Sequence, residues 1–134
     1  MFTDPIQSFL EAGPFGVAGA SSDRSKYGNK VLRCYAQRGL EAHPVHPSAE
    51  TIEGRACSRD VPSLPAEVGA LSIITPPPVT EKVVDAALAR GIHHLWMQPG
   101  AESASAIARA RAAGANVIHG GPCLLVVLGF RDRD

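Results

Sequence analysis

The sequence predicts an α/β fold, a Rossmann-like three-layer domain with a mainly parallel five-stranded sheet. Apolar runs that suit buried strands alternate along the chain with segments whose apolar residues recur at helical spacing. The apolar runs are continuous, which is typical of strands covered on both faces. At 134 residues, with no internal repeat or linker, the chain is expected to form one domain, residues 1–134.

The first third of the chain predicts two helices and two strands. Asp4 can cap a short helix that has Pro5 at its first position, and Gly13 ends it. A helix from Asn29 to Arg38 follows the first strand and ends at Gly39. The expected strands are Phe15–Gly19 and Leu40–Val45, the second of which ends at His46-Pro47.

The remaining elements are also bounded by glycines and prolines. Thr51–Pro65 is rich in turn residues and predicts irregular structure with room for one short strand. After it we expect strands at Ala70–Thr75, Ile92–Met97 and Asn116–His119, helices at Val79–Arg90 and Glu102–Ala113, and an apolar, glycine-punctuated tail from Gly120 to Phe130.

The composition argues against several classes of protein. Thirteen basic and thirteen acidic residues balance, and no basic run predicts a nucleic-acid surface. The longest apolar run, residues 123–128, is too short to cross a membrane. Three cysteines without a CxxC pair suit reduced thiols in the cytoplasm, which is the expected location. No motif identifies a protein partner.

The loop from Gly19 to Gly28 is suited to holding a phosphate. Glycine lets the backbone approach phosphate oxygens, and the N–H groups of a following helix point toward them. The hydroxyls of Ser21 and Ser25 and the ammonium of Lys26 add donors. The alternatives are a plain connection with a solvated lysine, and a Tyr27 ring that only covers the end of the sheet.

The other candidate loops follow from the predicted sheet. Ligands of open parallel sheets bind beyond the carboxyl ends of the strands. This edge brings together the Gly19–Gly28 loop with three others: His46–Ser48, Thr75–Pro78 and Gln98–Gly100. His46 can instead serve only its turn, and the prolines can serve only to start the next helix.

The sequence fits a dinucleotide site poorly. Such a site needs G-x-G-x-x-G and an acidic residue at the end of the second strand, or an arginine there for NADP. Here the first loop is long, and the second strand ends at Val45-His46-Pro47 with neither residue. A P-loop is also excluded, because no G-x-x-x-x-G-K-[ST] occurs.

Several short motifs in one order carry a family resemblance. They are Val17-Ala18-Gly19-Ala20-Ser21, Tyr27-Gly28, Pro44-Val45-His46-Pro47, Trp96-Met97-Gln98-Pro99-Gly100 and Ala112-Ala113-Gly114-Ala115-Asn116-Val117-Ile118. Together they resemble the small stand-alone CoA-binding proteins, which are similar to the CoA-binding domain of the succinyl-CoA synthetase alpha subunit. The resemblance covers residues 15–125. The chain departs from it in its triple proline, in His46 where asparagine is common, and around Cys123.

The resemblance implies a site for coenzyme A or an acyl-CoA along this edge. The phosphates would lie at the first loop, the adenosine at the second, and the pantetheine arm along the third and fourth. The residues implied are Gly19, Ala20, Ser21, Ser25, Lys26, Tyr27, Gly28, His46, Pro47, Thr75, Pro76, Pro77, Gln98 and Gly100.

Binding without catalysis is the expected function. No Ser/His/Asp set and no paired carboxylates converge on the four loops, and no metal is expected, because His119 and Cys123 lack a third ligand nearby. Two alternatives stay open: an NAD(P)-binding oxidoreductase-like domain, and a Rossmann scaffold used for protein interaction.

Overall fold

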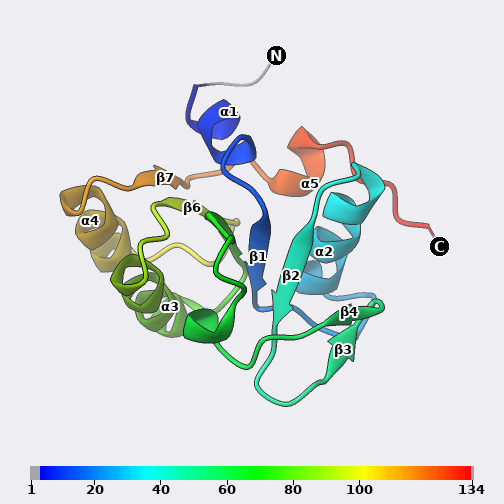
Figure 1. Cartoon of the computed structure of the whole chain (residues 1–134). Coiled ribbons are helices and arrows are strands. Elements are labelled where there is room, and N and C mark those ends of the chain that lie inside the picture. Colours follow the sequence, from blue (N-terminus) through cyan, green and yellow to red (C-terminus); the bar gives the residue numbers. More distant parts are fainter. Residues whose placement is uncertain (1–3, 134) are drawn as a thin grey trace.

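Five parallel strands form one sheet through the middle of the protein (Figure 1), as the sequence predicts. The structure is a computed structural model that describes residues 4–133. The strands lie in the order β2-β1-β5-β6-β7. They are β1 (Phe15–Ala18), β2 (Ala42–Val45), β5 (Ala70–Ile73), β6 (His94–Met97) and β7 (Asn116–Ile118).

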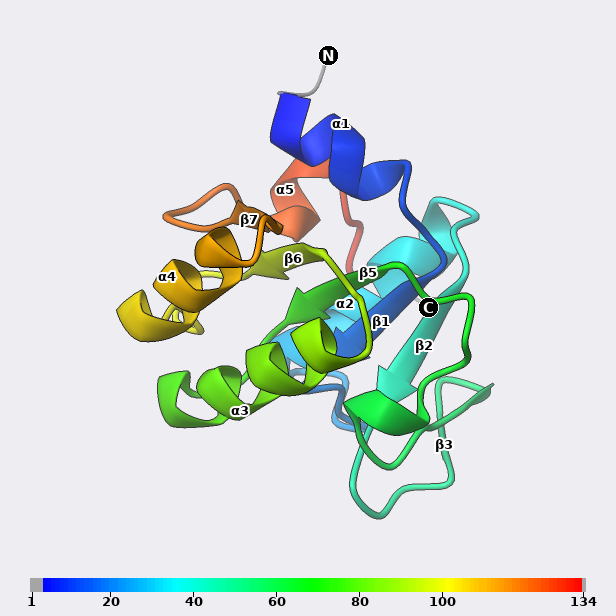
Figure 2. The same cartoon turned by 60° about the vertical axis from the view of Figure 1, so that its left-hand side comes forward.

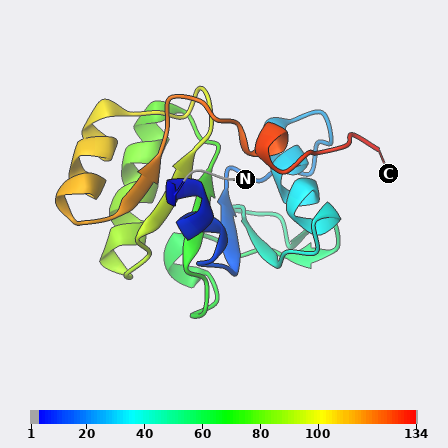
Figure 3. The same ribbon diagram turned by 90° about the horizontal axis from the view of Figure 1, so that it is seen from above.

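Helices cover both faces of this sheet and complete three layers, which Figure 3 shows from above. One face carries α1 (Asp4–Leu10), α2 (Tyr27–Gln37) and α5 (Leu124–Val127); the other carries α3 (Pro77–Ala89) and α4 (Ala104–Ala112). Figure 2 shows α3 and α4 side by side over the sheet. Each face of the sheet has its own apolar core, because strand side chains point alternately to the two faces.

Aromatic rings dominate the core beneath α1 and α2. Trp96, Tyr35, Phe9 and Phe15 are buried. Phe15 stacks on Tyr35, with ring centroids 4.7 Å apart, and Phe9 meets Trp96 edge-on at 5.3 Å. Trp96 and Met97, next to each other in β6, are both fully buried.

The differences from the sequence prediction that bear on the site are the starts of two helices and the structure of residues 51–65. Helix α2 begins at Tyr27 instead of Asn29, so Gly28 lies in its first turn. Helix α3 begins at Pro77 instead of Val79, since proline suits the first helical positions. Segment 51–65 holds more structure than expected: a hairpin of β3 (Thr51–Ile52) and β4 (Arg55–Ala56), then a 3₁₀ turn, η1 (Val61–Ser63).

None of the helices in residues 4–133 combines the length and the apolar character needed to span a bilayer.

Candidate functional site

The strand order places a topological switch point between the carboxyl ends of β1 and β5. The chain leaves β1 toward one face of the sheet, through α2, and leaves β5 toward the other face, through α3. Such a switch point is where open α/β sheets bind ligands. The two loops touch here: Gly19 has φ +95°, and a Cβ on it would lie 2.2 Å from the Ile74 carbonyl oxygen. Only glycine fits this position without movement of the backbone.

The amino end of α2 lies directly against the first loop. A Cβ on Gly28 would lie 1.9 Å from the Gly19 carbonyl oxygen, so the missing side chain allows this approach. Lys26 occupies the N-cap position and makes no side-chain cap. The first-turn N–H groups of a helix have no intrahelical partner, so the amino end of α2 offers donors to an anion.

Hydrogen bonds inside the loop fix its turn. The Asp23 carboxylate accepts bonds from the Ser25 N–H at 2.9 Å and the Ser25 hydroxyl at 2.7 Å, and these bonds lower the pKa of Asp23. Ser21 Oγ accepts from the Asp23 N–H at 3.0 Å. Both predicted serine donors therefore also shape the turn. Lys26 is exposed beside them, while Ala20 is buried.

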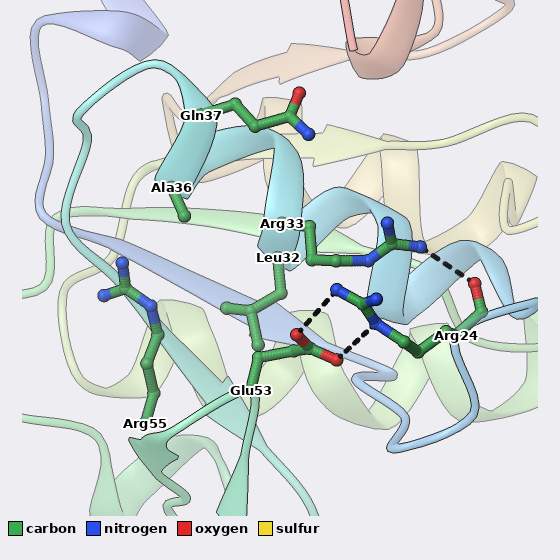
Figure 4. A pocket seen from close by; sticks show the side chains of 7 residues that line it. All are labelled: Arg24, Leu32, Arg33, Ala36, Gln37, Glu53 and Arg55. Carbon is green, nitrogen blue, oxygen red and sulfur yellow. Dashed lines mark hydrogen bonds and ion pairs between the residues drawn. The ribbon is translucent and has the colours of Figure 1, made fainter. Parts of the chain in front are cut away.

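A buried arginine connects the loop to α2, a role that the sequence analysis missed. Arg33 donates to the Asn29 side-chain oxygen at 2.7 Å. It also donates to the Arg24 carbonyl at 2.9 Å, the bond that Figure 4 shows. Asn29 in turn donates to the Ser21 carbonyl and to Glu53, and the Glu53 carboxylate pairs with Arg24 at 3.1 Å. These bonds lower the pKa of Glu53, the Asn29 bond most. The network holds both ends of the loop turn in place.

Tyr27 and Gln98 meet where the first and fourth loops adjoin. The Tyr27 hydroxyl donates to Gln98 Oε1 at 3.0 Å and hydrogen-bonds the thiol of Cys123, and burial raises the pKa of Tyr27. Gln98 Oε1 also accepts from the Leu124 N–H at 2.8 Å. Gln98 Nε2 is buried and has no partner within residues 4–133. The sequence predicted Tyr27 and Gln98 separately but not this contact with Cys123.

The turn after β2 is built around His46. Its Nδ1 accepts from the Ser48 and Ala49 N–H groups at 3.1 and 2.9 Å, so Nε2 is the nitrogen that carries the proton. His46 and Pro47 line a cavity of about 270 Å³ that also contains Arg59. The second strand itself ends without an arginine, as the sequence analysis states, but a later segment brings Arg59 into the lining of this cavity.

The loops after β5 and β6 line a second hollow, of about 280 Å³. Its walls include Thr75, Pro76, Pro99 and Gly100. Pro77, the remaining predicted residue, is exposed as the first residue of α3. Hydrogen bonding between the hydroxyls of Thr75 and Thr80, 2.7 Å apart, ties this loop to α3. The predicted residues therefore gather along one edge of the sheet, although no single cavity contains them all.

No group of three or more His, Cys, Asp or Glu side chains in residues 4–133 is arranged to hold a metal ion.

This fold and edge define a doubly wound α/β domain of the kind that binds nucleotides. The family comparison is more specific, because a model of the CoA binding domain matches residues 14–129. The chain belongs to this CoA binding domain family, as the sequence motifs predicted. A comparison with curated proteins found no match.

Solved structures share this fold. A conserved hypothetical protein from Pyrococcus furiosus is 36% identical, with a TM-score of 0.80, over 84% of this chain and 97% of its own. A hypothetical protein from Pyrococcus horikoshii OT3 is 23% identical, with a TM-score of 0.85, over 92% and 86%. A dinucleotide-forming acetyl-coenzyme A synthetase from Ca. Korarchaeum cryptofilum shares the fold, with 24% identity and a TM-score of 0.71, over 85% of this chain but only 27% of its own.

Proposed function

We propose that this protein binds coenzyme A or an acyl-CoA along the carboxyl edge of its sheet and performs no chemistry on it. The observation that carries the proposal is the close approach of α2 to the Gly19–Gly28 loop, beside the switch point between β1 and β5, where the free N–H groups of a helix amino end suit an anion. Membership of the CoA binding domain family supports CoA as the ligand. The ligand's phosphates would lie at this loop, near Lys26.

The chain's own groups suit the rest of such a ligand. The hollow walled by Thr75, Pro76 and Pro99 offers apolar surface to a long neutral arm. The amide of Gln98 is buried with an unused donor, and an amide carbonyl on that arm is the kind of acceptor it lacks. The Cys123 thiol is hydrogen-bonded to the Tyr27 hydroxyl, and no adjacent base in the described chain supports the use of this thiol as a nucleophile.

Thermal unfolding with different nucleotides tests this proposal. CoA at about 100 times its Kd should raise the free energy of unfolding by about 2.7 kcal/mol, or the Tm by roughly 10 °C. NAD at the same concentration should leave the Tm unchanged. A shift with NAD and none with CoA would favour an oxidoreductase-like domain, and no shift with any nucleotide would favour an interaction scaffold.

Replacing Lys26 with alanine tests the phosphate end of the site. Removal of one exposed ammonium should weaken CoA binding roughly fivefold, as expected for a solvent-screened charge. Stability should change by less than about 0.5 kcal/mol. The matched control is Lys30→Ala, one turn further along α2, where the ammonium pairs with Asp132 at 3.5 Å. Titration calorimetry measures the CoA affinity of both variants. If Lys26→Ala binds CoA as tightly as the wild type does, Lys26 is not part of the site.

A further inference from the structure

A short segment beside β2 brings Arg59 to the carboxyl edge of the sheet. Ser58 forms a parallel bridge with Val45; its N–H donates to the Pro44 carbonyl, and its carbonyl accepts from the His46 N–H, both at 2.9 Å. These bonds extend the sheet by one position past β2. They fix the backbone of Arg59 next to His46, at the end of the second strand of the fold.

Two hollows meet at Arg59. The first, of about 270 Å³, is the one that His46, Pro47 and Glu50 line. The second, of about 250 Å³, lies toward α3 and has mainly apolar walls. Its lining residues are Val45, Arg59, Asp60, Val61, Pro62, Lys82, Val83 and Ala86. The second hollow suits a flat apolar ring system, and the first suits a charged group joined to that ring. Arg59 lines both hollows.

The guanidinium of Arg59 is available to a ligand. It is exposed and has no hydrogen bond or ion pair to any of residues 4–133, whereas Arg24, Arg33 and Arg55 all donate to protein acceptors. Of the two carboxylates around it, Asp60 accepts two bonds from Ser63, at 3.0 Å from N–H and 2.5 Å from the hydroxyl.

Glu50 is the other carboxylate, and it lines the first hollow together with His46 and Arg59. His46 in the first hollow and Lys82 in the second add donors. With Glu50 and Asp60 balancing Arg59 and Lys82, net charge alone would not hold an anion here. The preference must come from hydrogen-bond geometry, which the planar fork of arginine provides for phosphate oxygens.

We infer that Arg59 makes this site selective for a nucleoside whose ribose carries a phosphomonoester, with the base in the apolar hollow. In doubly wound folds the group at the end of the second strand reads the ribose, a carboxylate preferring free hydroxyls and an arginine preferring a phosphate. The inference rests on the proposed function for the place of the ligand. CoA, with a 3′-phosphate, and NADP, with a 2′-phosphate, both carry the required group.

Titration calorimetry with CoA and 3′-dephospho-CoA tests the inference. The wild type should bind CoA about tenfold more tightly than dephospho-CoA, the effect of one charge-assisted hydrogen-bonded pair. Arg59→Ala should abolish this ratio by weakening CoA alone, and Arg59→Lys should restore part of it, because lysine keeps the charge but not the fork. Arg38→Ala, at the other end of α2, is the control and should leave the ratio unchanged.

The outcomes separate the inference from the proposed function. If the wild type binds both CoA forms equally, the inference is wrong and CoA binding stands. If CoA does not bind but NADP binds more tightly than NAD and loses that advantage in Arg59→Ala, the selectivity stands and the CoA proposal is wrong. If none of the four ligands binds, both are wrong.

Discussion

Replacing Gly28 with alanine is expected to destabilise the protein by about 3 kcal/mol, because the added methyl group would meet backbone that cannot rotate away. The Cβ would lie 1.9 Å from the Gly19 carbonyl oxygen. Relief requires α2 to move away from the first loop. Chemical denaturation measures the stability loss, and CoA titration at low temperature should show that the remaining folded protein has lost affinity.

The matched control for Gly28 is Gly39→Ala. Gly39 follows α2 with φ +68°, and a Cβ there would meet nothing within 4 Å. Gly39→Ala should therefore lower the free energy of unfolding only by the cost of a left-handed backbone, about 1 kcal/mol. CoA affinity should not change in this variant. Equal destabilisation by the two substitutions would contradict a tight contact between α2 and the first loop.

Replacing Trp96 with alanine is expected to cost about 3–5 kcal/mol, the usual range for removal of a buried large aromatic. The ring is fully buried and packs edge-on against Phe9, and its Nε1–H donates to the Pro122 carbonyl at 3.0 Å. Pro122 precedes Cys123, whose thiol is hydrogen-bonded to the Tyr27 hydroxyl. The tryptophan therefore also anchors the segment that holds Cys123 against Tyr27.

The variant Trp96→Phe separates the stability that comes from ring packing from the stability that comes from the hydrogen bond to Pro122. It keeps most of the apolar volume but leaves the Pro122 carbonyl without its donor, so the loss of stability should be smaller than in Trp96→Ala. Val126→Ala, at a position 79% exposed, should change stability by less than about 0.5 kcal/mol. Thermal unfolding measures all three variants. A Trp96→Ala loss no greater than that of Val126→Ala would contradict the packing around β6.

Local pattern was enough to predict the layers of this fold. Strands such as Phe15–Ala18 are continuous apolar runs closed by glycine, and helices such as Ala104–Ala112 end just before a glycine, here Gly114. The boundaries of α2 and α3 were harder to predict. Both helices begin at residues with weak helical preference, Tyr27 and Pro77, and only the position within the first turn makes them favourable.

The site was harder to predict, because its contacts join distant segments. The positions of Gly19 and Lys26 follow from one strand and the turn after it. Arg59 reaches the end of β2 only through the bridge between Ser58 and Val45, and no spacing rule encodes that bridge. Glu53 likewise meets Arg24 because a hairpin folds back over α2. Such side chains come together through the tertiary fold, so periodicity cannot reveal them.

Arg33 has a practical consequence for labelling this protein. It binds Asp132 at 3.1 Å and the Arg133 carbonyl at 3.3 Å, and it lies over the Phe130 ring while holding the Arg24 carbonyl. A fluorophore attached within residues 130–133 would therefore lie beside the Gly19–Gly28 loop and should report ligand binding at the proposed site. Affinity handles belong at the other end of the chain, since α1 leads into the amino ends of the strands (Figure 1).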